Sequence, residues 1–388
     1  MSDQKIKVLH IIKTLGLGGA EVNLLNLLSF MDQRQFELHV AYSYGGELEP
    51  KFLEAGIKLC KYAEKDHKVK SFATVGIVAR LVEYIRKHKI QIVHTHTFSA
   101  HIWGAAAAKL TGCRIVEHVH DFRYLEPEDF VRRRGFNNQY KFIKYFKNVS
   151  DRVVVLTRQN QEFLLQEGIY PLSRIREYQN GIPLTSVPAH PGRKERDAIL
   201  QEFGLDKNAL IVLTPIRVAP EKNADLVIRI AAQVVKRVPN AVFLIAGDGP
   251  LFQEVSQEIE KRNLTANVKL IGYYAQIGRL LEGADIFLLP SFLELHSIAI
   301  LEAMSKAVAV VISKDVGCNS EFIRDWENGI LLDPFADDGW AEAIVALCEN
   351  ENLRRKIGEA GLATCREKFD IKDAAARFVD LYQDLVKR

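Results

Sequence analysis

Short apolar runs alternate with longer amphipathic segments along the chain, and this pattern narrows the choice of fold more than any single motif. In the first half, segments typical of buried strands and of helices follow one another at Lys7–Ile12, Ala20–Phe30, Phe36–Tyr42, Val75–His88, Ile90–His94, Ser99–Leu110 and Arg152–Leu156. In the second half, we expect a helix over Asp225–Arg237 and strands at Leu210–Leu213, Val242–Ala246, Val268–Ile271, Ile286–Leu289, Val308–Ile312 and Ile330–Leu332. Strands separated by helices of about 10–15 residues indicate βαβ units and parallel sheets.

The length and the charge distribution indicate two domains. A chain of 388 residues is long enough for two domains of roughly 150 residues or more. Residues 1–185 carry 27 Lys and Arg against 19 Asp and Glu, a net charge of +8, whereas the remainder carries 25 against 30, a net charge of −5. The segment Pro183–Arg196 has the proline and glycine content of a linker. We therefore predict an α/β protein with two doubly wound domains, 1–187 and 188–370, that face each other across a cleft.

Composition favours a cytoplasmic protein. Hydrophobic residues make up 48% of the chain and charged residues 26%, as in ordinary soluble globular proteins. The sequence has no run of about 18 apolar residues that would span a membrane. The apolar stretch Val8–Ile12 is too short for the core of a signal peptide. Five scattered cysteines without a C-x-x-C motif favour reduced thiols.

Two loops carry candidate phosphate-binding residues. Gly18 and Gly19 lie between a strand and a helix, where glycines let backbone N–H groups approach a ligand at the helix N-terminus. A dinucleotide fingerprint is incomplete here because its third glycine would fall at Glu21, and a tight turn is the alternative. Arg217 and Lys222 follow the first strand of the second domain, at the edge where such sheets bind ligands. A guanidinium fork and a lysine charge suit a diphosphate; the alternative is two solvated surface cations.

Two glutamates form a second candidate pair. Glu294 and Glu302 are eight residues apart, which in one helix would separate them by about 12 Å along the axis. That exceeds the roughly 5–9.5 Å of a glycosidase carboxylate pair. We therefore expect Glu294 on a loop and Glu302 in the following helix, holding two ends of one extended ligand. The alternative is two unrelated surface glutamates.

Histidines are concentrated in the first half, and two H-x-H pairs suggest a metal site. The stretch Ile92–Ser99 resembles the metal-binding opening of PHP-type phosphoesterases. However, the second half has no cluster of aspartate and histidine to complete a metal cage, and the chain has no D-x-D motif. We predict no metal site and expect packed, hydrogen-bonded imidazoles, with a metal-dependent phosphoesterase as an alternative. The histidines concerned are His94, His96, His101, His118 and His120.

Taken in order, these segments resemble the family 4 retaining glycosyltransferases, which have the GT-B fold of two Rossmann-like domains. The resemblance covers nearly the whole chain and includes the region of the family's E-x7-E signature. The matching segments are Gly18–Glu21, Ile92–His96, Ile115–Asp121, Asn180–Ile182, Arg217, Glu221–Asn223, Ala246–Pro250, Ala284–Ile286, Pro290–Ser291, Glu294, Glu302–Met304 and Asn328–Gly329.

The resemblance implies a role for each matching residue. Arg217 and Lys222 would neutralise the leaving diphosphate of a nucleotide-sugar, Glu294 would contact the donor sugar, and Glu302 would bind the ribose hydroxyls. His120 would lie beside the sugar ring, with His118 as the rival assignment. The implied C-terminal helix, at about 371–388, would cross back to the first domain. The remaining donor-binding positions are Gly18, Gly19, Asn180, Gly247, Ser297 and Ile298.

The implied reaction needs no metal cofactor, because fixed cations stabilise the charge that develops on the leaving group. The chain departs from the family pattern after Glu294, where Leu295-His296-Ser297-Ile298 replaces a glycine-containing stretch and its side chains are expected to crowd the loop. Pro215 replaces a glycine, and Ala307-Val308-Ala309 replaces a G-x-P turn. The altered loop after Glu294 keeps a catalytically silent, glycosyltransferase-like partner protein as an alternative. Another GT-B enzyme, such as a nucleotide-sugar epimerase, is a further alternative.

The acceptor implied by the resemblance is a glycan or a lipid-linked precursor. A basic, aromatic segment, Arg132–Lys147, places Lys141, Lys144 and Lys147 on one helical face. Such a helix suits peripheral contact with anionic lipid at the inner face of the cell membrane, and equally suits a core-packed helix with a solvated basic face. We find no nucleic-acid recognition module and expect no nucleic-acid partner.

Overall fold

The computed structural model describes residues 5–63, 73–120, 147–184 and 193–387. The chain divides into two compact units, residues 1–183 with 371–388, and residues 184–370. The expected boundary between residues 187 and 188 falls outside the described residues. So does the basic, aromatic segment apart from its last residue, Lys147. Within the described ranges, no helix is both long enough and apolar enough to cross a membrane.

The described residues of the first unit form a parallel seven-stranded sheet in the order β3-β2-β1-β4-β5-β6-β7. Its strands are β1 Ile6–Ile11, β2 Phe36–Tyr42, β3 Lys58–Lys61, β4 Ile92–His96, β5 Arg114–His118, β6 Arg152–Val155 and β7 Ile175–Glu177. Its helices are α1 Gly19–Ser29, α2 Glu49–Glu54, α3 Ala73–His88, α4 Phe98–Thr111, α7 Arg158–Gln166, the 3-10 turn η4 Leu172–Arg174 and α16 Ile371–Lys387.

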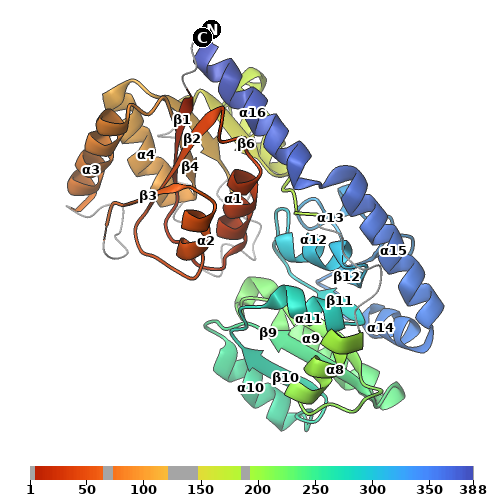
Figure 1. The fold of residues 1–388 in the computed structure, drawn as a ribbon. Coiled ribbons are helices and arrows are strands. Elements are labelled where there is room, and N and C mark those ends of the chain that lie inside the picture. The colour runs from red at the N-terminus through yellow and green to blue at the C-terminus, as the bar shows by residue number, and fades with distance from the viewer. Residues whose placement is uncertain (1–4, 64–72, 121–146, 185–192, 388) are drawn as a thin grey trace. The chain divides into compact units, whose positions relative to one another are not determined.

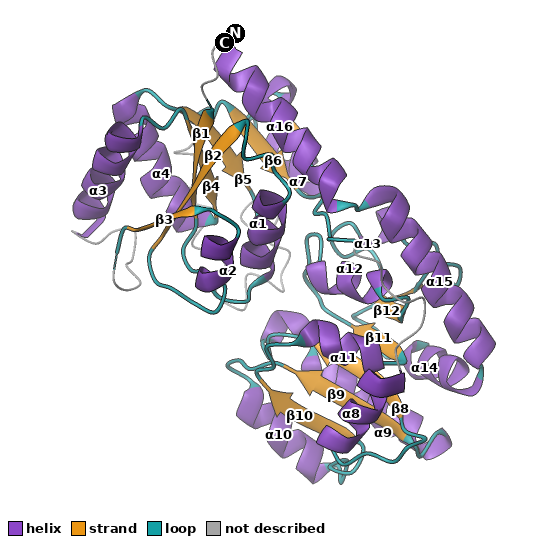
Figure 2. Ribbon diagram, in the orientation of Figure 1, coloured by secondary structure: helices purple, strands orange, loops and turns teal. Residues whose placement is uncertain are grey.

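Helices cover both faces of this sheet (Figures 1 and 2). Alternate residues of a strand point to opposite faces, so Val8 packs with α1 and α16, whereas Leu9 packs with α3 and α4. Helix α16 comes from the far end of the chain and buries Phe378 and Tyr382 in the first of these cores. The first unit is therefore completed by the last helix of the sequence.

The described residues of the second unit form a parallel six-stranded sheet in the order β10-β9-β8-β11-β12-β13. Its strands are β8 Leu210–Pro215, β9 Ala241–Ala246, β10 Val268–Gly272, β11 Ile286–Leu289, β12 Ala309–Ser313 and β13 Ile330–Leu332. Its helices are α8 Arg193–Glu202, the 3-10 turn η5 Pro220–Lys222, α9 Ala224–Arg237, α10 Phe252–Lys261, α11 Ile277–Gly283, α12 Ile298–Ser305, α13 Asn319–Phe322, α14 Trp340–Glu349 and α15 Glu351–Lys368.

Both sheets have the doubly wound topology in which the strand order reverses beside the first strand. The reversal lies between β1 and β4 in the first unit and between β8 and β11 in the second. Ligands of such sheets bind outside the carboxyl ends of the strands at this switch point. The residues that follow β8 and β11 are therefore the first place to look for a site in the second unit.

Two expectations about the elements were wrong. The strand expected at Ile90–His94 runs over Ile92–His96, because Lys89 takes a left-handed φ of 55° and the Ile90 N–H donates to the Ile85 carbonyl at 3.1 Å, which closes α3. The last residues of the expected linker Pro183–Arg196 belong to α8, where Arg196 donates to the Gly283 and Ala209 carbonyls at 2.8 and 2.7 Å.

Candidate functional site

An ion pair joins the loops that follow β8 and β11. Lys222 Nζ lies 2.6 Å from Glu294 Oε1, and the two side chains are only 20% and 9% exposed. The residues are separated by 72 positions in the sequence. Because the two parent strands are neighbours at the switch point, the pair stands where a doubly wound sheet presents ligand-binding groups.

The backbone around this pair is held by specific contacts. Asn223 takes the left-handed conformation, with φ of 55°, which asparagine tolerates better than most residues. Its side-chain amide donates to the Pro290 and Pro334 carbonyls at 3.1 and 3.2 Å. The Phe292 N–H donates to the Glu221 carbonyl at 2.8 Å. The two loops are thus tied by backbone as well as by charge.

Arg217 lies on the same loop and rests on the turn after β9. Its side chain is 58% exposed, and its guanidinium pairs with Glu221. The Val218 N–H donates to the Asp248 carbonyl at 2.9 Å. Gly247 has φ of 144°, and a Cβ there would lie 1.8 Å from the Ile216 carbonyl oxygen. The turn at Gly247 therefore lies closer to the loop that carries Arg217 than any residue with a Cβ could.

Helix α12 follows the Glu294 loop. Ser297 is its N-cap residue and Ile298 its first, buried residue, and N–H groups of a first helical turn lack intrahelical acceptors. Glu302 lies within this helix, as expected, and Glu294 lies on the loop before it. Burial raises the pKa of Glu302 to about 7, although the nearby Lys306 opposes the shift. Such a group changes its charge near neutral pH.

The side chains of Leu295 and His296 were expected to crowd this loop, but they do not. They are 5% and 4% exposed and lie in the interior. The His296 ring is 5.6 Å from Phe322 and 5.0 Å from Phe369, and burial lowers its pKa to about 3. The Cys318 N–H donates to the Leu295 carbonyl at 3.0 Å. The departure from the family's glycine-containing stretch is accommodated by the core.

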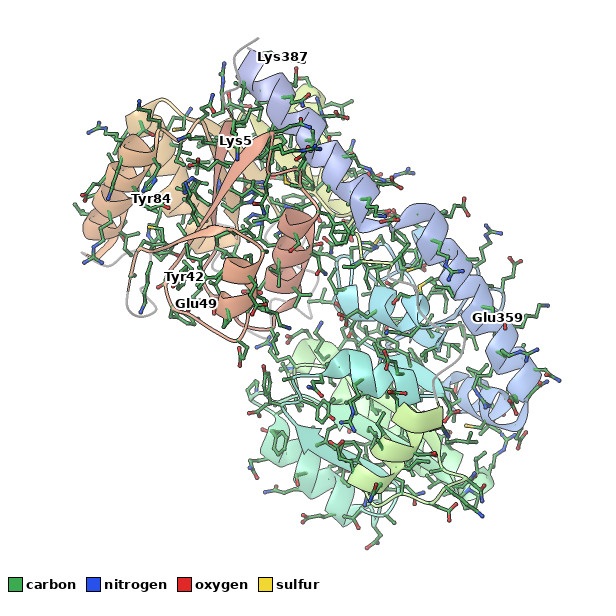
Figure 3. All side chains as sticks on the ribbon, in the orientation of Figure 1. Lys5, Tyr42, Glu49, Tyr84, Glu359 and Lys387 are labelled. Atoms are coloured by element: carbon green, nitrogen blue, oxygen red, sulfur yellow. The ribbon has the colours of Figure 1, made fainter. Side chains whose placement is uncertain are left out.

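In the first unit, the loop that leads through Gly18 into α1 packs against α1 and α2. Gly18 is the N-cap of α1 and Gly19 its first residue, and a Cβ on Gly18 would collide with the Glu21 carboxylate. Burial raises the pKa of Glu21 to about 7. The Leu48 N–H donates to the Leu15 carbonyl at 3.0 Å. The Tyr42 hydroxyl donates to Glu49 at 2.7 Å, which fixes α2 against β2 (Figure 3).

His118 and His120 differ in access. His118 ends β5 and is 1% exposed, whereas His120 is half-buried, with its Nε2 3.1 Å from His96 Nδ1. Burial lowers the pKa values of His96 and His118 well below the usual range. Of the two rival residues, His120 is the more exposed.

The structure brings some predicted residues together within each unit. It places Lys222 against Glu294 and the Arg217 loop against Gly247, and it brings His118 beside His120, with ring centroids 3.9 Å apart. Asn180 is buried near the end of the first unit, where a Cβ on Gly181 would lie 2.8 Å from Ile371 Cα in α16.

Sequence reasoning missed two partners of the predicted residues. Glu221 pairs with Arg217, but a spacing of four residues indicates an ion pair only within a helix, and Arg217 lies on the loop before the 3-10 turn η5. His96 contacts His120. The sequence identifies His96 only as a histidine near a strand end, because its partner follows a different strand.

Two family models match most of the chain. The model described as Glycosyltransferase Family 4 matches residues 17–186, and the model described as Glycosyl transferases group 1 matches residues 195–364. The two matches correspond to the two Rossmann-like units. An Escherichia coli relative, UDP-Gal:alpha-D-GlcNAc-diphosphoundecaprenol alpha-1,3-galactosyltransferase, is 26% identical over 98% of both chains.

Solved structures show the same architecture. HepE of Anabaena, solved with UDP and glucose, has a TM-score of 0.82 at 20% identity and covers 97% of this chain and 99% of its own. WaaG, a glycosyltransferase involved in lipopolysaccharide biosynthesis, has a TM-score of 0.74 at 15% identity, with 97% and 99% covered. The chain has the GT-B fold and belongs to glycosyltransferase family 4, as an enzyme that transfers a sugar from a nucleotide-sugar.

Proposed function

We propose that this enzyme transfers its sugar with retention of anomeric configuration, without a metal, to a lipid-linked glycan precursor. The observation that carries the donor site is the Lys222–Glu294 pair, at 2.6 Å between the loops that follow β8 and β11. It fixes a cation and a carboxylate at the switch point of the second sheet. Arg217 lies on the same loop, and its side chain is 58% exposed.

Charge complementarity explains how these residues serve the reaction. Breaking the bond between sugar and phosphate leaves negative charge on the nucleotide diphosphate. Arg217 and Lys222 are cations already held in place, so they stabilise this charge without reorganisation in the transition state. A divalent metal would supply the same charge, so the transfer does not require one.

The remaining residues position the donor. Glu302 accepts hydrogen bonds from the ribose hydroxyls, and Glu294 contacts the sugar while it holds Lys222. The family resemblance assigns His120 a place beside the sugar ring. It assigns further donor contacts to Gly247, Ser297 and Ile298 in the second unit and to Gly18, Gly19 and Asn180 in the first.

The acceptor proposal rests on the E. coli relative, whose name specifies a GlcNAc-diphosphoundecaprenol acceptor and a UDP-Gal donor. A lipid diphosphate acceptor would place this enzyme at the inner face of the cell membrane, and contact through Arg132–Lys147 stays a prediction. The name of this relative specifies sugar transfer and gives no support to the epimerase alternative.

Donor binding and turnover test this proposal directly. Chelator-treated enzyme is heated with UDP-, GDP-, ADP- and dTDP-sugars, because a ligand that binds only folded protein raises the unfolding temperature. With the donor so identified, a polyprenyl-diphosphate sugar is supplied as acceptor. We expect turnover in the chelator and an α-linked product from an α-linked donor, read by NMR of the anomeric proton. Loss of turnover that returns with added Mg²⁺, or a β-linked product, contradicts the proposal.

Two substitutions assign the roles within the site. Arg217→Ala should lower kcat by about 10²–10³-fold, the usual cost of one transition-state donor, whereas Glu302→Ala should mainly weaken donor binding. Arg262→Ala is the matched control, since Arg262 also pairs with a glutamate four residues away, at 37% exposure. Wild-type kinetics in both site variants would overturn these assignments.

A further inference from the structure

Histidines form a ladder across one face of the first sheet. His10 of β1 pairs with His94 of β4, and His96 of β4 pairs with His118 of β5. His94 and His96 are two residues apart, so they point to the same face. His120 lies two residues beyond His118, with its ring centroid 5.2 Å from that of His96. Five imidazoles are thus gathered at the carboxyl end of three adjacent strands.

The nitrogens of this ladder are incompletely paired. His96 Nδ1 lies 3.1 Å from His120 Nε2, and His96 Nε2 lies 3.0 Å from His10 Nδ1. His118 is 1% exposed, and in the described part of the chain neither of its ring nitrogens has a hydrogen-bond partner. A buried polar group is normally satisfied, so His118 indicates a ligand that completes the cluster.

We propose that His96, His118 and His120 form a binding site for a divalent transition metal of the zinc class. One nitrogen from each ring lies within 4.8 Å of the others. Tetrahedral zinc with bonds of about 2.0–2.1 Å needs ligand atoms roughly 3.4 Å apart. The 3.1 Å between His96 Nδ1 and His120 Nε2 is close to that spacing. Imidazole nitrogens select zinc, copper, nickel or cobalt over magnesium and calcium.

The surroundings of the site resemble those of known zinc centres. A ligating histidine usually engages its second nitrogen with a neighbour that fixes the ring, and the pair of His96 Nε2 with His10 Nδ1 provides this contact. Three ligands leave a fourth position for water or another ligand. Of these three ligands, His120 is the least buried, being half-buried.

A rival group, His10, His94 and His96, also satisfies the distance requirement. All three are at most 1% exposed, so an ion has no direct access to them. His94 Nδ1 is already 2.5 Å from the Tyr382 hydroxyl of α16. We therefore assign the metal to the group that contains His118 and His120.

This site goes beyond the proposed transfer, which needs no metal. The two share His120, so the test measures metal binding rather than turnover, and its failure leaves the proposed function standing. Metal-free full-length enzyme is titrated with Co²⁺. We expect one equivalent to bind and to give the visible absorption of a low-symmetry cobalt centre, which Zn²⁺ then abolishes. Calorimetry with Zn²⁺ alone should give the same stoichiometry.

Substitutions locate the site. His118→Gln and His120→Gln should each weaken Zn²⁺ binding by more than about 100-fold, and His10→Gln by about 10–100-fold, as expected of a residue that orients a ligand. His94→Gln tests the rival group and His88→Gln, in α3, is the remote control; both should bind like the wild type. Circular dichroism confirms that each variant is folded.

Three outcomes overturn the assignment: the wild type binds no stoichiometric metal, His120→Gln binds as tightly as the wild type, or His94→Gln abolishes binding. If His118→Gln does not fold, the wild-type titration and the half-buried His120 variant still decide the question.

Discussion

At the scale of single residues, the carboxyl group of Glu302, the proposed ribose ligand, makes the stability of the protein depend on pH. Burial in α12 raises its pKa to about 7, well above the usual value of about 4.3. The folded protein therefore binds a proton more tightly at this position than the unfolded chain does. Between these two pKa values the unfolded chain releases this proton while the folded protein keeps it, so the contribution of Glu302 to stability is fully present below about 4.3 and is lost as the pH rises through about 7.

We therefore expect Glu302→Gln to gain stability relative to the wild type as the pH increases from 5 to 8. Urea unfolding at each pH measures this difference, because the amide cannot ionise. Glu254→Gln is the control, since Glu254 is exposed on α10 and its replacement should leave the pH dependence unchanged. A Glu302→Gln difference that stays constant over this range would show that the carboxyl does not titrate there.

At the scale of elements, the turn after β9 packs closely against the loop after β8. Gly247 has φ of 144°, a conformation that L side chains rarely adopt, and a Cβ there would lie 1.8 Å from the Ile216 carbonyl. We expect Gly247→Ala to lower stability by at least about 1–3 kcal/mol, the range for a strained backbone position. It should also weaken donor binding, because the Arg217 loop must move.

The matched control is Gly278→Ala in α11, where a Cβ would have no heavy atom within 4 Å. Gly278 is the second residue of α11 and has an ordinary backbone conformation, and alanine loses less conformational freedom on folding than glycine, so this variant should be no less stable than the wild type. Thermal unfolding and donor titration of both variants check the prediction. If the two variants had the same stability and donor affinity, the close approach of Gly247 to the Ile216 carbonyl would not exclude a Cβ.

The elements themselves were largely predictable, because periodicity and turn residues are local signals. The ends of the elements were less predictable. No local signal shows that Lys89 takes a left-handed conformation, so that β4 begins only at Ile92. Pairing between distant residues was not predictable at all. The Lys222–Glu294 contact spans 72 positions, and the His10–His96 contact spans 86. Both contacts depend on which strands are neighbours in the sheet. The sequence indicated this arrangement only through the family resemblance.

At the scale of the whole molecule, the first unit depends on a helix from the far end of the sequence. Helix α16 packs on α1 and β1, and it buries Phe378 and Tyr382 among residues from the start of the chain. The Tyr382 hydroxyl also contacts His94. The stability of residues 1–183 is therefore inseparable from residues 371–388, although the second unit lies between them in the sequence.

Because the first unit depends on α16, a substitution in this helix should destabilise the first unit and leave the second unit unchanged. Phe378 is 3% exposed, so Phe378→Ala should cost about 3–5 kcal/mol. Val386 is on the same helix at 38% exposure, and Val386→Ala should change stability by no more than about 0.5 kcal/mol. Amide hydrogen exchange resolves where the loss falls. Protection should drop in β1, β2 and β4 and stay at the wild-type level in β8, β9 and β11. A uniform loss over both sheets would mean that the two units unfold as one, and no loss in β1 would mean that α16 does not hold the first sheet.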